Sequence, residues 1–210
     1  MTHMDHGMGL ILEALADAGI EEETLVIYFS DNGGEEDWGA PATYYKGKFD
    51  PHDQLGDNRP LRGWKGDVYE GGIRVPAVLF WPGRLKPGTV TEVTSVQDLY
   101  PTIAHLTGAA VPRSMEIEGL NIWSSITRQG SIPERVLYWR REEQTAVRKG
   151  SWKLIVHGQD VDKGNRELFH IEEDPEEKSN LSESRPEIVK ELLVEMKNQI
   201  SKDRPINNED

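Results

Sequence analysis

The sequence contains no cysteine among its 210 residues. This absence excludes disulfide bridges, thiolate metal sites and a cysteine nucleophile within the chain, but it leaves the cellular compartment open. No stretch approaches the roughly eighteen consecutive apolar residues of a membrane span. The N-terminus also has no charged leader followed by an apolar stretch. We therefore expect no membrane among the partners of this chain.

Positive charge is scarce. Lys and Arg number 24 against 37 Asp and Glu, which gives a formal net charge of -13. Such a balance argues against non-specific binding to nucleic acid or to an anionic membrane, where basic groups must displace counterions. An anionic substrate would need a local positive pocket. The apolar share of 36% is enough for a core, and the length suits one moderate domain or one and a half.

A strand-like run over residues 24–30 ends abruptly at Asp31, Asn32, Gly33 and Gly34. The run is apolar on both faces, which is typical of a central strand in an α/β sheet. Ligands gather at the C-terminal ends of such strands. Asp31 and Asn32 offer oxygen ligands for a hard cation there, although Asp-Asn-Gly is also an ordinary turn sequence whose side chains cap their own backbone.

A second cluster of chemically informative residues follows about thirty positions later. Lys65 lies between glycines in Gly63-Trp64-Lys65-Gly66, and the chain continues through Glu70-Gly71-Gly72. The glycines allow a backbone to approach a ligand closely, so Lys65 is a candidate for binding an anion. The alternative is a solvated loop lysine, with Glu70 paired to Arg74 across a bend. One cation site and one anion-binding lysine together suggest hydrolysis of an anionic ester.

Both clusters resemble the sulfatase family of the alkaline phosphatase superfamily. That family carries a Ser-Asp-Asn-Gly strand end followed by Gly-Lys-Gly and Tyr-Glu-Gly-Gly-Ile-Arg-Val-Pro. The likeness is close over residues 24–32 and 62–83 and covers nearly the whole chain. Further matching segments are residues 4–15, 97–103, 146–155, 167–169, 174–176 and 180–181.

The resemblance implies an activity and a site. Asp31 and Asn32 would help to hold Ca2+ or Mg2+, and Lys65 would be a catalytic residue that binds the sulfate. Residues 35–61 form a long aperiodic loop, and His52 in it is a candidate for touching substrate. The substrate would be a sulfated small molecule or carbohydrate. The parent enzyme is expected to be periplasmic or secreted.

The family nucleophile is a formylglycine made from Cys or Ser in a Cys/Ser-x-Pro-x-Arg motif, which is expected in an N-terminal part missing from this chain. Residues 131–135, Ser-Ile-Pro-Glu-Arg, match this motif residue by residue. They lie C-terminal to the strand that ends at Asp31, whereas the family motif lies N-terminal to it, so we interpret them as a chance match. The family's first pair of metal aspartates is also absent. We therefore expect the C-terminal portion of a sulfatase, inactive alone, whose partners include the missing N-terminal half. Two alternatives stay open: a phosphodiesterase or phosphonate hydrolase of the same superfamily, and a truncated homologue without catalytic activity.

The expected fold class is α/β, with the C-terminal part of an alkaline-phosphatase-like sheet in residues 1–133. Residues 134–210 are expected to form a small antiparallel sheet of about four strands covered by a C-terminal helix. Helical spacing predicts a helix from residue 8 to Gly19 and another over residues 98–107. A second apolar strand is expected at residues 77–81. Residues 184–187 have capping-box spacing before the final helix.

Overall fold

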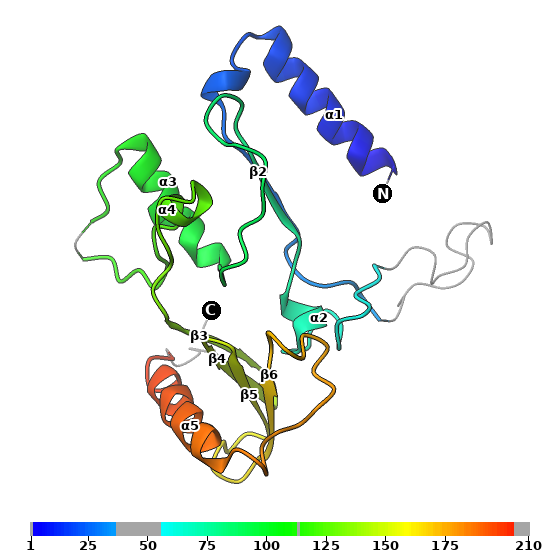
Figure 1. Ribbon diagram of the computed structural model, residues 1–210, viewed down its shortest axis with the longest axis vertical. Helices are drawn as coiled ribbons and strands as arrows, with labels where there is room; N and C mark the ends of the chain where they lie inside the picture. Colours follow the sequence, from blue (N-terminus) through cyan, green and yellow to red (C-terminus); the bar gives the residue numbers. More distant parts are fainter. Residues whose placement is uncertain (1, 37–55, 113, 204–210) are drawn as a thin grey trace, which may run out of the picture. The chain divides into compact units, whose positions relative to one another are not determined.

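The computed structural model describes residues 2–36, 56–112 and 114–203 (Figure 1). The chain forms two compact units. The first comprises Met1–Tyr28 and Ala77–Pro133, and the second comprises Phe29–Pro76 and Glu134–Asp210. The second unit groups residues 29–76 with the C-terminal sheet. The assignment of the catalytic domain to residues 1–133 stays a prediction.

The first unit begins with the predicted N-terminal helix, α1 (Thr2–Asp17). It ends just before Gly19, whose φ of +68° suits a glycine stop. After η1 (Glu21–Glu23), strand β1 (Val26–Phe29) pairs with β2 (Ala77–Phe80) in a two-stranded sheet. The expectation of a central strand is not met among the described residues, because only β2 pairs with β1 there. No residue of β1 is fully buried.

Helix α3 (Leu99–Thr107) follows η3 (Val96–Asp98) and ends at Gly108 with φ +70°, as predicted. The spacing of Leu99, Ile103 and Leu106 predicts that these residues form the apolar face of the helix. That prediction is wrong, since Thr102 and Ala104 are buried while Ile103 is exposed. Asp98 and Thr102 accept hydrogen bonds from the backbone N–H groups of Leu120 (2.8 Å) and Ile122 (3.0 Å). These bonds turn the polar side of α3 toward the segment before α4 (Trp123–Ile126).

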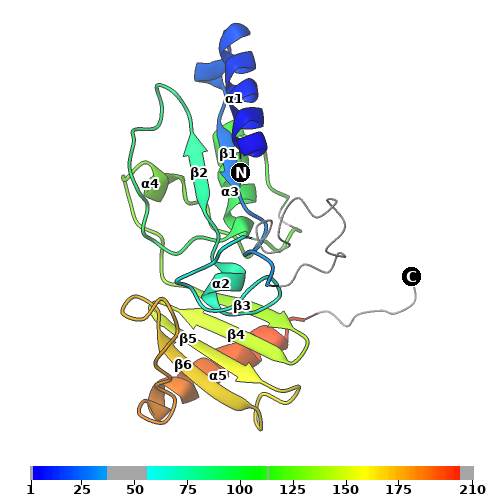
Figure 2. The same cartoon turned by 90° about the vertical axis from the view of Figure 1, so that its right-hand side faces the viewer.

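The second unit contains the predicted antiparallel sheet and C-terminal helix. Strands β3 (Val136–Arg141), β4 (Gln144–Lys149), β5 (Trp152–His157) and β6 (Asn165–His170) pair in sequence order. Helix α5 (Pro186–Ile200) covers one face of this sheet (Figure 2). The predicted four strands and their helical cover are therefore confirmed.

The sheet is buried on both faces, because the strands are apolar on both sides. One core joins the sheet to α5 and contains Val147, Leu154, Val156, Leu168, Val189, Leu192 and Met196. On the opposite face, Ala146, Ile155 and Phe169 pack with Val68 and Tyr69, which precede the short helix α2 (Glu70–Ile73). The segment that follows Lys65 is thus anchored directly on the sheet.

The predicted capping box at the start of α5 is wrong. The N-cap residue is Arg185, which makes no side-chain cap, and Pro186 occupies the first turn. The Ser184 hydroxyl instead donates to the Leu181 carbonyl at 3.1 Å. That preceding turn uses the side chain that the capping box would need.

Across the parts of the chain that the structure describes, no helix is both long and apolar enough to span a membrane.

Candidate active site

The turn after β1 carries the two predicted metal ligands. Ser30 Oγ donates to the Asn32 carbonyl at 2.9 Å, and Asn32 Nδ2 donates to the Gly33 carbonyl at 2.7 Å. These bonds leave the Asn32 Oδ1 as the side-chain atom available to a cation. The Asp31 carboxylate is exposed, with no hydrogen bond or ion pair to any other described residue.

The turn at residues 31–34, called the metal turn below, lies in backbone contact with the segment at residues 63–72 that carries Lys65, called the lysine loop. Gly33 N donates to the Gly72 carbonyl at 3.0 Å, and Lys65 N donates to the Gly34 carbonyl at 2.8 Å. A Cβ at Gly33 would lie 1.7 Å from the Gly71 carbonyl oxygen. Since real Cβ atoms do not approach oxygen so closely, a residue without a side chain is required there. The structure therefore brings together two motifs that lie some thirty residues apart in sequence.

Asn58 reinforces that contact with a single side chain. Its Oδ1 accepts from Gly34 N at 2.7 Å, while its Nδ2 lies 3.2 Å from the Gly34 carbonyl and 3.1 Å from the Gly63 carbonyl. The carboxamide thus connects the metal turn to the lysine loop. Sequence reasoning missed this residue, because an asparagine in an aperiodic loop carries no local signal of a distant partner.

Lys65 itself is half exposed. Its Nζ lies 3.1 Å from Glu35, and both side chains are about half accessible. The ion pair is therefore weak and open to exchange with another anion. Asp67 stabilises the loop by accepting from Trp64 N at 2.9 Å, which holds the backbone beside Lys65 in a tight turn.

A buried ion cluster anchors the segment that follows Lys65 to strand β5. Lys153 Nζ lies 2.9 Å from Glu70 Oε1 and 2.8 Å from Glu177 Oε1, and all three side chains are at most 3% exposed. Glu177 Oε2 also accepts from Glu70 N at 2.7 Å. Burial raises the pKa of the Glu177 carboxyl, against the opposing charge of Lys153. Arg74 lies within ion-pair distance of Glu70 at 3.6 Å, as the alternative interpretation expected, but Lys153 is the closer partner.

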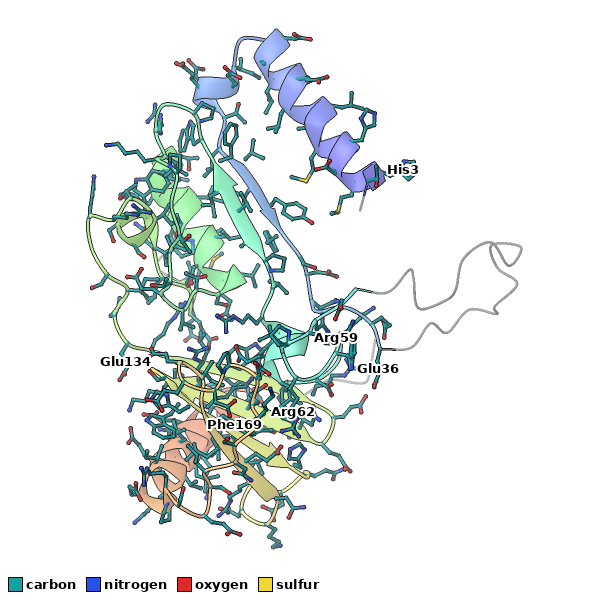
Figure 3. All side chains as sticks on the ribbon, turned by 45° about the vertical axis from the view of Figure 1, so that its right-hand side comes forward. His3, Glu36, Arg59, Arg62, Glu134 and Phe169 are labelled. Atoms are coloured by element: carbon teal, nitrogen blue, oxygen red, sulfur yellow. The ribbon has the colours of Figure 1, made fainter. Side chains whose placement is uncertain are left out.

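A second polar cluster surrounds Tyr69 and includes Arg62, which is labelled in Figure 3. The Arg62 guanidinium lies 3.9 Å from the centre of the Tyr69 ring and donates to the Tyr69 hydroxyl and to Glu167. The Tyr69 hydroxyl donates to Glu167 and contacts His157 Nε2 at 3.2 Å. Burial opposes ionisation of Glu167, but hydrogen bonds from Tyr69, His157 and Arg62 hold the pKa of its carboxyl below the ordinary value. Burial and the same bond to Glu167 raise the pKa of the Tyr69 hydroxyl.

Lys153, Glu177 and Glu167 were not identified from the sequence. The signal for Lys153 was present in its strand, because Leu154 and Val156 face one side and Lys153 and Ile155 the other. A strand with two apolar faces needs two covers, and α5 supplies only one. A lysine on the second covered face must therefore meet a carboxylate.

A metal would find part of a coordination shell here. Within the described residues no group of three or more His, Asp or Glu side chains could hold a metal ion. Asp31 and Asn32 have the oxygen donors that calcium prefers, but calcium takes about six to eight such ligands. The pair fits the cation chemically and supplies only part of its shell. His52 lies outside the described residues.

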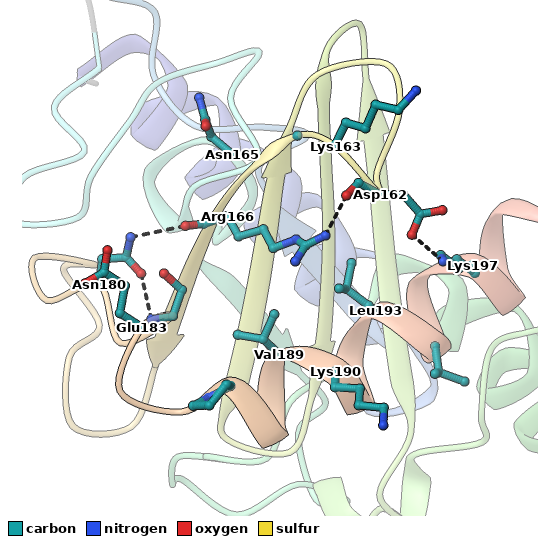
Figure 4. A pocket seen from close by; sticks show the side chains of 14 residues that line it. Asp162, Lys163, Asn165, Arg166, Asn180, Glu183, Val189, Lys190, Leu193 and Lys197 are labelled. Carbon is teal, nitrogen blue, oxygen red and sulfur yellow. Dashed lines mark hydrogen bonds and ion pairs between the residues drawn. The ribbon is translucent and has the colours of Figure 1, made fainter.

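A separate groove of about 830 Å3 lies between α5 and the connection from β5 to β6 (Figure 4). Most of its cationic side chains are engaged locally. Lys197 pairs with Asp162 at 2.5 Å, Lys163 pairs with Asp160 at 3.2 Å, and Arg166 donates to the Asp162 carbonyl at 2.8 Å. None of the predicted site residues lines this groove.

Two family models match the chain. The model described as "Sulfatase" matches residues 1–109, and the model described as "N-sulphoglucosamine sulphohydrolase, C-terminal" matches residues 63–205. The chain therefore belongs to the sulfatase family. The mixed α/β architecture and the C-terminal sheet with its helix agree with the fold that the sequence predicted.

Three individual relatives are sulfatases with different names. The chain is 35% identical to arylsulfatase A of Homo sapiens over 66% of its own length and 25% of the relative. It is 40% identical to steryl-sulfatase of Mus musculus over 58% of its length and 18% of the relative. It is 32% identical to N-acetylgalactosamine-6-sulfatase of Canis lupus familiaris over 73% of its length and 27% of the relative. The chain thus spans about a quarter of these relatives or less.

Solved structures share the fold. The crystal structure of Ps i-CgsB in complex with k-i-k-neocarrahexaose superposes with a TM-score of 0.71 at 31% identity, covering 94% of this chain and 40% of the other. Phosphonate monoester hydrolase of Agrobacterium radiobacter superposes with a TM-score of 0.62 at 20% identity, covering 93% and 39%. At that lower identity the likeness concerns the fold alone.

Proposed function

We propose that this chain is the C-terminal part of a sulfuric ester hydrolase. Within that enzyme it contributes Asp31 and Asn32 as metal ligands and Lys65 as the sulfate-binding lysine. The observation that carries the proposal is the backbone contact between the two motifs, through Gly33 to Gly72 and Lys65 to Gly34. Membership of the sulfatase family supports it independently.

Each residue has a defined chemical task. The Asp31 carboxylate and the Asn32 carboxamide present oxygen atoms to Ca2+ or Mg2+. A bound divalent cation polarises an ester oxygen and stabilises negative charge on it. Lys65 places a compact ammonium against the sulfate or the bridging oxygen, and so offsets the charge that grows as the alcohol departs. Arginine is a poor replacement, because its planar fork differs from a point-like ammonium.

We further propose that the formylglycine nucleophile and the first aspartate pair are supplied by an N-terminal segment of the parent enzyme. We propose that the 210-residue chain does not turn over sulfate esters by itself, because Asp31 and Asn32 alone compensate poorly for dehydration of the cation.

The test uses the full-length product of the open reading frame that contains this sequence. Lys65→Ala should lower kcat for a sulfate ester by about a hundredfold or more, since removal of one charge-stabilising donor typically has that effect. Lys178→Ala removes the same charge from an exposed site and serves as the control. Unchanged kinetics in the Lys65 variant would refute the assignment.

The second candidate is a phosphonate or phosphodiester hydrolase of the same superfamily. This chain shares its fold with the phosphonate monoester hydrolase. Those enzymes more often use Asp-His pairs for a second metal, whereas Asn32 follows Asp31 here. Parallel assays of the same polypeptide with an aryl sulfate and aryl phosphate esters separate the two. A third candidate, a homologue without catalytic activity, is favoured if neither ester is cleaved.

A further inference from the structure

A pocket of about 710 Å3 lies beside Lys65 and is formed by the loop at residues 65–67, the β3–β4 turn and His157. This volume is within the range of small-molecule sites. We propose that the pocket binds the sugar ring of a sulfated carbohydrate, with Arg141 reading its hydroxyl groups while Lys65 takes the sulfate. The inference rests on the proposed function and specifies the alcohol.

The lining of the pocket favours a sugar over an aryl or steroid alcohol. Among the described residues that line it, none has an aliphatic or aromatic hydrocarbon side chain. An apolar ring would lose water there without gaining apolar contacts. A sugar instead presents hydroxyl groups that both donate and accept, and Arg141, Gln144 and Glu143 offer donors and acceptors to match.

The close approach of Arg141 to the lysine loop requires Gly66. A Cβ at Gly66 would lie 2.3 Å from Arg141 Nη1 and 2.8 Å from its Cζ, so the guanidinium lies over the glycine backbone. Gly66 also has φ +100°, a conformation that favours glycine. The Arg141 guanidinium therefore packs against Gly66, the neighbour of Lys65, whose positive φ disfavours any residue with a side chain.

The Arg141 guanidinium keeps most of its donors for a ligand. Its ion pair with Glu142 is 3.9 Å long, and the two side chains are 55% and 82% exposed. Such a pair contributes little and competes weakly. A guanidinium has five N–H donors in a fixed fork, which suits neighbouring hydroxyl oxygens.

Three pocket residues form a row across the sheet. Arg141 pairs with Gln144 in the β3–β4 register, and Gln144 pairs with His157 in the β4–β5 register. Directly opposed residues share a face of a sheet. Gln144 accepts from Val68 N at 3.3 Å, and His157 Nε2 contacts Glu167 at 2.8 Å. Two members of the row are thus held in position before any ligand arrives.

The pocket contains side chains of both charge signs, so we expect the sulfate to bind only at the end that carries Lys65. Lys65 and Arg141 are accompanied by Asp67, Glu142 and Glu143. An environment with both signs does not favour a second sulfate. It does suit a neutral polyhydroxylated ring attached to the sulfate at Lys65.

Titration of the 15N-labelled 210-residue chain tests the proposal by NMR with D-galactose 6-sulfate, 4-nitrophenyl sulfate and inorganic sulfate as probes. We expect the sugar sulfate to bind about tenfold tighter than the aryl sulfate, since hydrogen bonds to a charged group discriminate by that order. Arg141→Ala should abolish the preference. Arg141→Lys should keep the affinity for inorganic sulfate but lose most of the preference, because it lacks the fork.

Arg140→Ala is the matched control. Arg140 precedes Arg141 on the same strand, is similarly exposed and pairs with Asp203 at 2.9 Å, so its loss removes an equal charge from the hairpin outside the pocket. The preference should persist in that variant. Equal affinity for both esters in the unsubstituted chain, or equal effects of the two arginine variants, would overturn the inference.

The proposed function fails in a distinguishable way. If the sulfate probes bind and Lys65→Ala removes that binding, but no sugar preference exists, only the pocket assignment is wrong. If Lys65→Ala changes the affinity of none of the three probes, the sulfate-binding role of Lys65 is wrong and the pocket assignment falls with it.

Discussion

At the scale of single residues, Lys153 shows how a buried charge fixes the loop that carries Lys65. Its ammonium, 0% exposed, lies between Glu70 and Glu177. Arg148 adds a longer contact to Glu70 at 3.8 Å. Removing these ions from water costs desolvation free energy, and only their mutual attraction offsets that cost. The cluster therefore stabilises the fold only while all partners are present. Its value to the site is that it ties α2 to β5.

Lys153→Met tests this dependence. Removal of the lysine leaves two buried carboxylates without their shared partner, so we expect a loss of about 3–5 kcal/mol in the free energy of unfolding. Urea denaturation followed by circular dichroism measures it. Lys163→Met, at a side chain that is 85% exposed, should change stability by no more than about 0.5 kcal/mol. Equal effects of the two substitutions would contradict the account.

Glu167 gives the fold a pH dependence of defined sign. Its pKa is lowered from 4.5 in the folded chain, so its contribution to stability is present above pH 4.5 and is lost as the pH falls below that value. The pKa of Glu177 is raised, so its contribution has the opposite sign and grows as the pH falls toward 4.5. Glu167→Gln should therefore flatten the acid side of the stability curve. Denaturation midpoints between about pH 3 and 6 measure the effect, and a curve with an unchanged acid limb would refute it.

At the scale of elements, the contact between the metal turn and the lysine loop depends on glycine. Gly33→Ala would place a Cβ 1.7 Å from the Gly71 carbonyl oxygen, so we expect the two segments to separate. Backbone amide exchange across residues 63–72 should accelerate. Gly9→Ala in α1 meets nothing within 4 Å and should leave this exchange unchanged, while it stabilises the helix by up to about 1 kcal/mol. Unchanged exchange in the Gly33 variant would argue against the contact.

Local pattern predicted most elements but few of their contacts. The strands of the small sheet and α5 were predictable because hydrophobic period and turn residues are local signals. The capping box failed because Ser184 bonds to Leu181 instead, and the face of α3 failed because Asp98 and Thr102 bind distant backbone groups. The resemblance identified Asp31, Asn32 and Lys65. Neither route revealed Glu177 or Arg141, whose partners lie far away in sequence.

At the scale of the whole molecule, exposed apolar side chains gather in the first unit. Leu10 and Ile11 in α1 and Val78 and Phe80 in β2 are between 47% and 59% exposed. Apolar surface of this kind, on a sheet that has only two strands among the described residues, promotes association.

We therefore expect the purified chain to self-associate weakly, to an extent that increases with protein concentration. Sedimentation velocity measures this, and Val78→Ser should weaken association. Val194→Ser, at a similarly exposed position in α5, is the control. A chain that stays monomeric, or an equal response to the two substitutions, would contradict the expectation.

The most direct test of the central claim is sulfate ester turnover in the longest polypeptide encoded with this chain, measured alongside the 210-residue chain alone. The account predicts turnover in the longer protein that requires both Asp31 and Lys65, and none in the short chain. Robust turnover by the short chain, or full activity of the longer protein after Asp31→Ala and Lys65→Ala, would contradict it.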